Sequence, residues 1–166
     1  MIKVSILIIS DRSYRGERSD ASGPALREVV EALGWQVVRQ DILPDDLLAI
    51  RDMLIAWADK GTIDILLTTG GTGFSPRDVT PEATQSAVER QAPGLAEAMR
   101  TAGLKVTPHA MLSRATAGIR GRTIIVNLPG SPKGAVENLK VILPVLPHAV
   151  ELLREEPSAE SGHRQV

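Results

Sequence analysis

The sequence predicts an α/β protein with a mostly parallel sheet that is covered by helices on both faces. Stretches of consecutive aliphatic and β-branched residues, typical of strands buried on both faces, alternate with stretches in which apolar residues recur every three or four positions. This alternation implies right-handed crossovers between parallel strands. The 166 residues, of which 43% are hydrophobic, are enough for one compact domain with its own core.

The first half of the chain predicts three strands and two helices. In order, these are a strand over residues 3–10, a helix opening at Ser22-Gly23-Pro24, a strand over 35–42, a helix from Asp45 to Lys60-Gly61, and a strand over 63–69. Asp45 is expected to cap its helix, because a carboxylate at that position accepts from free backbone N–H groups. Gly34 supplies the permissive backbone for the exit from the first helix.

The second half predicts three more helical regions and one more buried strand. These are a helix with Thr80 as cap and Pro81 in its first turn, a helix over 95–104, a strand over 122–128 after an edge hairpin through Arg120-Gly121, and a region from Pro132 to about Arg154 that Pro144 and Pro147 bend. Residues 155–166 are polar and lack periodic apolar positions, so we expect a domain over 1–154 and a flexible C-terminal tail.

The composition argues against several classes of protein. Cysteine is absent, which excludes thiolate metal sites and cysteine nucleophiles. The net charge of -1 and the four aromatic residues give neither a field nor a stacking platform for nucleic acid, so no nucleic-acid partner is expected. No segment approaches membrane-spanning length and no signal peptide is evident, so we expect a cytoplasmic protein without a membrane partner.

Four polar loops follow the predicted strands. They cover residues 10–20, 43–46, 70–80 and 127–133. In an open α/β sheet, ligands bind beyond the carboxyl ends of the strands, at the point where the strand order reverses. These loops are therefore the expected site.

A glycine-rich loop, Thr69-Gly70-Gly71-Thr72-Gly73, follows one of the strands. Successive glycines let backbone N–H groups turn toward an anion, which suits phosphate. No Gly-Lys-Ser/Thr follows, and Pro76 stands where the dinucleotide fingerprint needs its third glycine. From the glycines alone, a tight turn without a ligand is equally consistent.

Charged residues flank this loop and the other strand ends. Asp78 and Asp45 could hold Mg²⁺, with Arg77 facing phosphate oxygens. The alternative is that both carboxylates only stabilise helix N-termini. Lys133, in the first turn of a helix, opposes the helix dipole, which favours a bound anion over a solvated lysine. The three histidines show no metal-ligand spacing.

The run from Thr68 to Thr84, which contains TTGGTGFSPRDVTPEAT, closely resembles the signature of the molybdopterin-binding family that includes MogA and MoaB. Ser10-Asp11-Arg12, Leu43-Pro44-Asp45 and the segment Asn127 to Lys133 resemble the family's other motifs in the same order. The resemblance extends from about Lys3 to about Leu153.

This resemblance implies a three-layer α/β/α sandwich that assembles as a homotrimer or homohexamer. It also implies Mg²⁺-dependent adenylyl transfer from ATP to molybdopterin, with handover of the product to a molybdenum-insertion protein. Asp45 and Asp78 match the residues that serve as catalytic residues and metal ligands. The positions implied to bind substrate are Ser10, Asp11, Gly70, Gly71, Thr72, Gly73, Arg77, Asn127, Pro129, Gly130, Ser131 and Lys133.

Two other functions share the same fold. A noncatalytic protein of the MoaB type would hold molybdopterin without using ATP. A domain like that of CinA proteins would act on other nucleotides or on none. That domain is normally joined to another, and the end of this chain soon after Leu153 counts against it.

Overall fold

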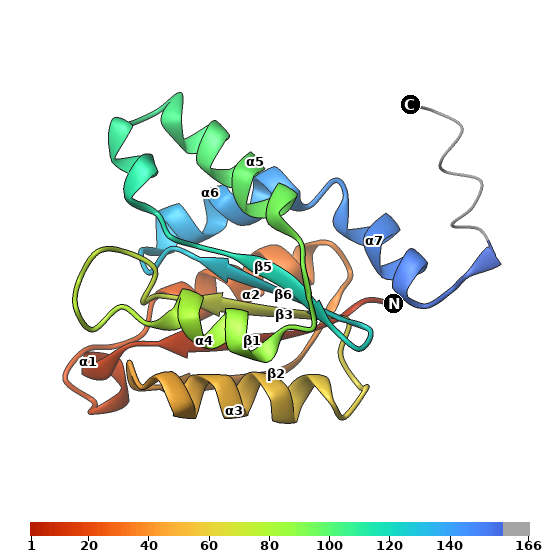
Figure 1. Ribbon diagram of the computed structural model, residues 1–166, viewed down its shortest axis with the longest axis horizontal. Coiled ribbons are helices and arrows are strands. Elements are labelled where there is room, and N and C mark those ends of the chain that lie inside the picture. Colours follow the sequence, from red (N-terminus) through yellow and green to blue (C-terminus); the bar gives the residue numbers. More distant parts are fainter. Residues whose placement is uncertain (158–166) are drawn as a thin grey trace.

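The computed structural model describes residues 1–157, which form a six-stranded sheet with helices on both faces (Figure 1). The strand order is β2-β1-β3-β6-β5-β4. The strands are β1 (Lys3–Ile9), β2 (Gln36–Leu43), β3 (Ile65–Thr69), β4 (Arg90–Gln91), β5 (Ala117–Arg120) and β6 (Thr123–Leu128). The pairs β1·β2, β1·β3 and β3·β6 are parallel, whereas β5 is antiparallel to both of its neighbours. The mostly parallel sheet is thus confirmed.

Two apolar clusters, one on each face of the sheet, make up the core. Helices α2 (Ser22–Ala32), α5 (Pro93–Leu104), α6 (Pro132–Ile142) and α7 (Leu146–Leu153) pack on one face, and α3 (Leu47–Ala58) and α4 (Thr80–Ala87) pack on the other. Successive side chains of a strand point to opposite faces, so Ile6 of β1 joins the first cluster and Leu7 joins the second. The three-layer α/β/α sandwich is confirmed.

Two helix caps differ from the sequence-based expectation. Asp46, not Asp45, is the N-cap of α3, and its carboxylate accepts from the N–H of Ala49 at 2.7 Å. Val79 precedes α4 as its N-cap, and the Thr80 hydroxyl instead donates to the carbonyl of Gly70 at 2.9 Å. Both differences arise because a residue of the strand-end loops is held by a tertiary contact rather than by its own helix.

The C-terminal helical region is broken, not only bent. Helix α6 ends at Ile142, and α7 begins at Leu146 with Pro147 in its first turn. Pro144 lies in the turn between them, where its missing N–H breaks no helical hydrogen bond. The tail expected from residue 155 lies, from residue 158 on, outside the described residues.

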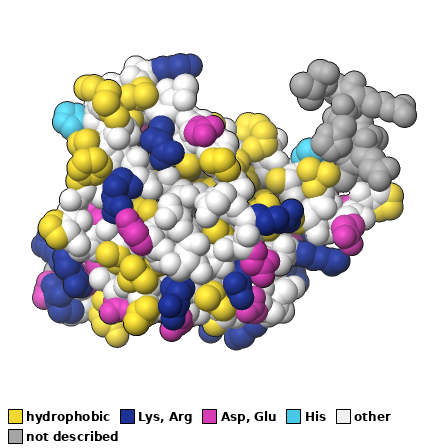
Figure 2. Space-filling model, in the orientation of Figure 1, with side chains coloured by type: hydrophobic (Ala, Val, Ile, Leu, Met, Phe, Trp, Pro, Cys, Tyr) yellow, Lys and Arg dark blue, Asp and Glu magenta, His cyan; other side chains and the backbone are white. Residues whose placement is uncertain are grey.

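Three short elements are additional to those expected from the sequence. These are α1 (Asp11–Tyr14), the 3₁₀ helix η1 (Pro108–Leu112) and β4, which forms the sheet edge in place of the β5·β6 hairpin. Hydrophobic side chains gather over α5 and η1 in Figure 2. Val106, Met111 and Leu112, which lie in or just before η1, are exposed. Within residues 1–157, none of the helices has the length and hydropathy needed to cross a bilayer.

Candidate functional site

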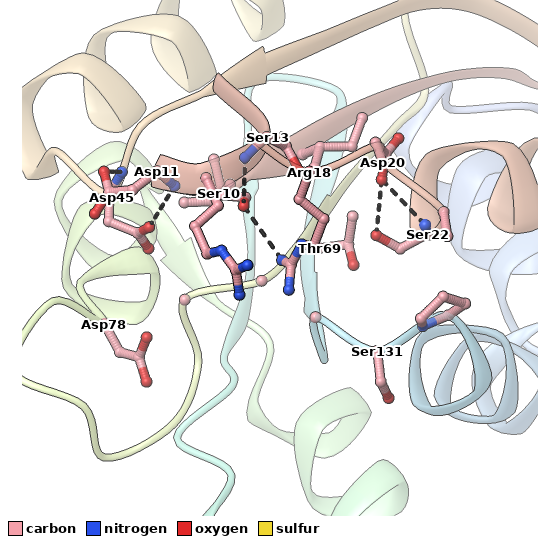
Figure 3. Close-up of a pocket in the computed structure, with 18 of the residues that line it drawn as sticks. Ser10, Asp11, Ser13, Arg18, Asp20, Ser22, Asp45, Thr69, Asp78 and Ser131 are labelled. Carbon is pink, nitrogen blue, oxygen red and sulfur yellow. Dashed lines mark hydrogen bonds between the residues drawn. The ribbon is translucent and has the colours of Figure 1, made fainter. Parts of the chain in front are cut away.

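A cavity of about 650 Å³ opens beyond the carboxyl ends of β1 and β3. The strand order reverses there, because β2 lies on one side of β1 and β3 lies on the other. The cavity, drawn in Figure 3, brings together these expected residues: Ser10, Asp11, Asp45, Gly70, Gly71, Arg77, Asp78, Gly130 and Ser131. The four loops chosen from the sequence therefore meet at one site.

Asp11 and Asp45 fix each other at one side of this cavity. The N–H of Asp11 donates to Oδ2 of Asp45 at 3.0 Å, and the N–H of Asp45 donates to Oδ1 of Asp11, also at 3.0 Å. Asp45 is available for this contact because Asp46 caps α3. The strand-end loops that follow β1 and β2 are thereby locked together with a carboxylate of each facing the cavity (Figure 3).

The electrostatic environments of these two carboxylates differ. Burial, together with the negative charges of Asp11 and Asp78, raises the pKa of Asp45 above its ordinary value, although the N–H of Asp11 and the charge of Arg77 oppose the shift. The guanidinium of Arg77, whose Nη2 lies 2.9 Å from Oδ1 of Asp11, lowers the pKa of Asp11. The negative charge of Asp45 is therefore less well compensated by neighbouring groups than that of Asp11.

The donor set fits a divalent cation of the Mg²⁺ type. Mg²⁺ takes one or two protein carboxylates and completes its shell with water and substrate phosphates. Burial is the largest cause of the raised pKa of Asp45, and a cation beside Asp45 and Asp78 would offset the negative charges that add to it. No cluster of three or more His, Cys, Asp or Glu suited to a metal occurs within residues 1–157.

Two glycines shape the loop after β3 by adopting positive φ angles, 103° at Gly70 and 66° at Gly71. The N–H of Gly70 donates to the carbonyl of Leu128, and the Thr80 N–H donates to the carbonyl of Gly71. A Cβ on Gly71 would collide with Oγ1 of Thr80 and approach Oδ1 of Asp45 to 3.0 Å. Glycine is thus required here both by the backbone conformation and by the close packing against Asp45.

Asp78 closes the second part of the loop. Its Oδ2 accepts from the N–H groups of Gly73 and Ser75, each at 3.1 Å, while its own N–H donates to the carbonyl of Ser75. The N–H of Gly73, which we expected to bind phosphate, is therefore directed to Asp78. Thr72 and Gly73 line a neighbouring groove and not the main cavity.

Three further expected residues do not line the main cavity. Asn127 is fully buried; its Nδ2 donates to the hydroxyls of Thr68 and Thr84, and its Oδ1 accepts from the Thr116 N–H. Pro129 contributes a carbonyl that accepts from Thr69. The side chain of Lys133 is 83% exposed and lies 3.8 Å from Glu137. In this structure Asn127 connects β6 to α4, and Lys133 faces solvent.

Between β1 and the start of α2, residues beyond the substrate-binding positions expected from the sequence also line the cavity, among them Arg12, Arg18, Asp20 and Ser22. Arg18 reaches the hydroxyl of Ser10 at 3.4 Å, and Asp20 accepts from the N–H of Ser22 at 3.0 Å. Figure 3 shows Asp20 and Ser22 across the cavity from Asp45 and Asp78. The spacing Asp-x-Ser before a helix was the available signal, because such side chains satisfy free N–H groups at helix starts.

Arg114 stabilises the loop between Gly73 and Asp78 through contacts with its backbone. Its Nε donates to the carbonyl of Gly73 and its Nη2 to the carbonyl of Asp78, both at 2.7 Å, and it forms an ion pair with Glu82. No local pattern marks this arginine, since its partners lie more than thirty residues away in the chain.

Comparison with known proteins agrees with this geometry. Residues 5–148 match the family described as probable molybdopterin binding domain. The chain belongs to this family. Its match extends from β1 into α7 and so includes every loop of the cavity.

The relatives include proteins of similar length and much longer ones. The chain is 40% identical to the molybdopterin adenylyltransferase of Helicobacter pylori strain J99, over 92% of this chain and 88% of that protein. It is also 40% identical to gephyrin of Dictyostelium discoideum over 97% of its own length, but spans only 24% of gephyrin. The MoaB structure from Thermus thermophilus superposes with a TM-score of 0.89 at 52% identity, covering 95% of this chain and 99% of that one.

Proposed function

We propose that this protein transfers the adenylyl group of ATP to molybdopterin in a Mg²⁺-dependent reaction. The observation that carries the proposal is the convergence of Asp11, Asp45 and Asp78 on one cavity beside the turn formed by Gly70 and Gly71. The adenylyltransferase of Helicobacter pylori, at 40% identity over most of both chains, supports the same reaction.

The reaction requires little covalent chemistry from the protein. An oxygen of the terminal phosphate of molybdopterin attacks the α-phosphorus of ATP, the bond from that phosphorus to the bridging oxygen breaks, and pyrophosphate leaves. The attacking phosphate is already a nucleophile, so no protein nucleophile is needed. The protein must align the two phosphates and offset negative charge, which are the main sources of catalysis in phosphoryl chemistry.

The cavity residues suit these two tasks. Asp45 and Asp78 would hold Mg²⁺, which when bound neutralises the charge that develops on pyrophosphate. Arg12, Arg18 and Arg77 supply cations for phosphate oxygens around the same cavity. Ser131 adds a hydroxyl from the start of α6, where it also accepts from the N–H of Gly134 at 3.1 Å.

The test is pyrophosphate release from ATP and Mg²⁺, with and without molybdopterin, by the wild type and by Asp78→Asn. We expect release that requires molybdopterin and that falls on the order of 10²-fold in the variant, as when one preorganised electrostatic contact is lost. The matched control is Asp46→Asn, because asparagine also caps helices and Asp46 does not line the cavity. Its turnover should equal that of the wild type.

Two results would contradict the proposal. Molybdopterin binding without pyrophosphate release by the wild type would identify a noncatalytic binding protein of the same fold. Equal turnover by Asp78→Asn and the wild type would remove Asp78 from the reaction.

We also propose that the protein acts in the cytoplasm as a homotrimer or homohexamer and hands its product to a molybdenum-insertion protein. The exposed hydrophobic side chains over α5 and η1 are consistent with self-association. Sedimentation velocity would test the assembly, and a monomer at all concentrations would contradict it.

A further inference from the structure

A second cavity, of about 430 Å³, lies at the amino-terminal end of β1, whereas the site described above lies at its carboxyl end. We propose that it binds a small tetrahedral oxyanion, either free phosphate or the phosphate group of a nucleotide. Ser5, Trp57 and the cationic residues Lys3, Arg39 and Lys60 carry the argument, and all five line the cavity. Binding there would be independent of adenylyl transfer.

Two residues that line this cavity each carry a buried polar atom without a hydrogen-bond partner within residues 1–157. Oγ of Ser5 and Nε1 of Trp57 form no hydrogen bond to any described residue, and the two residues are 0% and 3% exposed. Buried hydroxyl and indole groups are normally paired, because leaving them unpaired costs free energy. Ser5 lies on the face of β1 that otherwise packs Leu7 and Ile9 into the core. Both groups are hydrogen-bond donors, and a bound oxyanion would supply the acceptor that each of them lacks.

The charges around the cavity are of one sign. Lys3, Arg39 and Lys60 are its only charged lining residues among the described part of the chain, and none of the three forms an ion pair with a described carboxylate. Of the neighbouring acids, Asp59 forms an ion pair with Arg120 and Asp64 with Arg154, each at 2.8 Å. The carboxylate of Asp64 also accepts from the backbone N–H of Lys3 at 2.7 Å. Three cations that form no ion pair with a described carboxylate thus line the same cavity as Ser5 and Trp57, which favours a bound anion.

The geometry favours a compact anion over an aromatic ligand. The guanidinium of Arg39 lies 4.9 Å from the centroid of the Trp57 ring and so covers a face on which a base would stack. Lys60 follows the end of α3, where any cation complements the helix dipole, so Lys60 alone would indicate no ligand. The unpaired donors of Ser5 and Trp57 are what distinguish this cavity from an ordinary basic surface.

The test is a titration of the full chain with inorganic phosphate at constant ionic strength, observed through the indole N–H signals of Trp35 and Trp57 by ¹H–¹⁵N NMR. We expect the Trp57 signal to shift and saturate while that of Trp35 stays in place, since Trp35 packs against the opposite cluster. This readout separates the cavity from any phosphate bound near Gly71. Parallel titrations with sulfate and AMP distinguish free oxyanions from a nucleotide phosphate, and a shift with AMP alone would identify the nucleotide as the source.

Surface variants keep the test independent of folding. Arg39→Gln and Lys60→Gln should each weaken binding about tenfold, the effect of losing one charge-assisted contact. Lys105→Gln, a lysine at the end of α5 that does not line the cavity, is the matched control and should bind as the wild type does. The proposal is overturned if neither phosphate, sulfate nor AMP moves the Trp57 signal, if chloride moves it equally, or if Lys105→Gln weakens binding as much as Lys60→Gln.

Discussion

The backbone N–H of Asp11 and that of Asp45 each donate to the carboxylate of the other residue, and both distances are 3.0 Å. This reciprocal pair joins the ends of β1 and β2 and places a half-buried carboxylate opposite Asp78. The arrangement costs stability, because Asp45 ionises in a partly desolvated position near two other carboxylates. Removing the charge of Asp45 should therefore affect stability and turnover in opposite directions.

Asp45→Asn is expected to stabilise the protein at neutral pH in the absence of Mg²⁺ while lowering turnover on the order of 10²-fold. Because the pKa of Asp45 is raised on folding, the folded state binds this proton more tightly than the unfolded state does. The stability from this difference is complete below the unfolded pKa and is lost as pH rises through the folded pKa. Urea unfolding as a function of pH measures this. The free energy of unfolding of the variant should exceed that of the wild type at neutral pH and equal it in acid. A lower free energy of unfolding for the variant at neutral pH would contradict the assignment.

Arg77→Gln should raise the pKa of Asp11 toward its ordinary value. The hydrogen-bonded guanidinium is the largest cause of the lowered pKa, and this contribution to stability is present above the unfolded pKa and lost as pH falls through the folded pKa. Carboxyl ¹³C chemical shifts would give the titration of Asp11. Arg122→Gln, which removes an exposed arginine paired with Glu155, serves as control and should leave that titration unchanged.

Gly71→Ala should reduce both stability and turnover, whereas Gly34→Ala should reduce stability alone. Both glycines have positive φ, 66° and 75°, so each substitution carries a backbone cost of about 1–2 kcal/mol. A Cβ on Gly34 meets no atom within 4 Å, but one on Gly71 meets Thr80 and Asp45. Thermal unfolding and pyrophosphate release would compare the two. Equal losses of stability in both variants would show that the contact with Asp45 and Thr80 is unimportant.

Arg114→Gln should loosen the loop between Gly73 and Asp78. The substitution removes charged donors from two loop carbonyls and an ion pair with Glu82, and we expect a loss of about 2–3 kcal/mol of unfolding free energy. Hydrogen exchange at the N–H groups of Gly73 and Ser75 should accelerate, because Asp78 is then less firmly placed to accept from them. Unchanged exchange there would show that Asp78 holds the loop without Arg114.

The sequence determined the layers and the location of the site. Consecutive aliphatic residues in β1, β3 and β6 require burial on both faces, and parallel strands bring their carboxyl ends to one edge, so the loops beginning at Ser10, Gly70 and Asn127 had to converge. The two glycines at positions 70 and 71 likewise predicted a backbone conformation that other residues rarely adopt. The positive φ angles of Gly70 and Gly71 confirm it.

Only the tertiary structure decided which side chains of those loops face the cavity. Asp46 caps α3, so the carboxylate of Asp45 is free to accept from the N–H of Asp11, a residue 34 positions away. The side chain of Asn127 donates to the hydroxyls of Thr68 and Thr84 and so does not face the cavity. Arg114 donates to the carbonyl of Gly73, in a loop far from it in the sequence. Local patterns report a residue's preference for a cap, a turn or a strand, whereas the partner of a polar side chain depends on which distant segment the packed layers bring beside it.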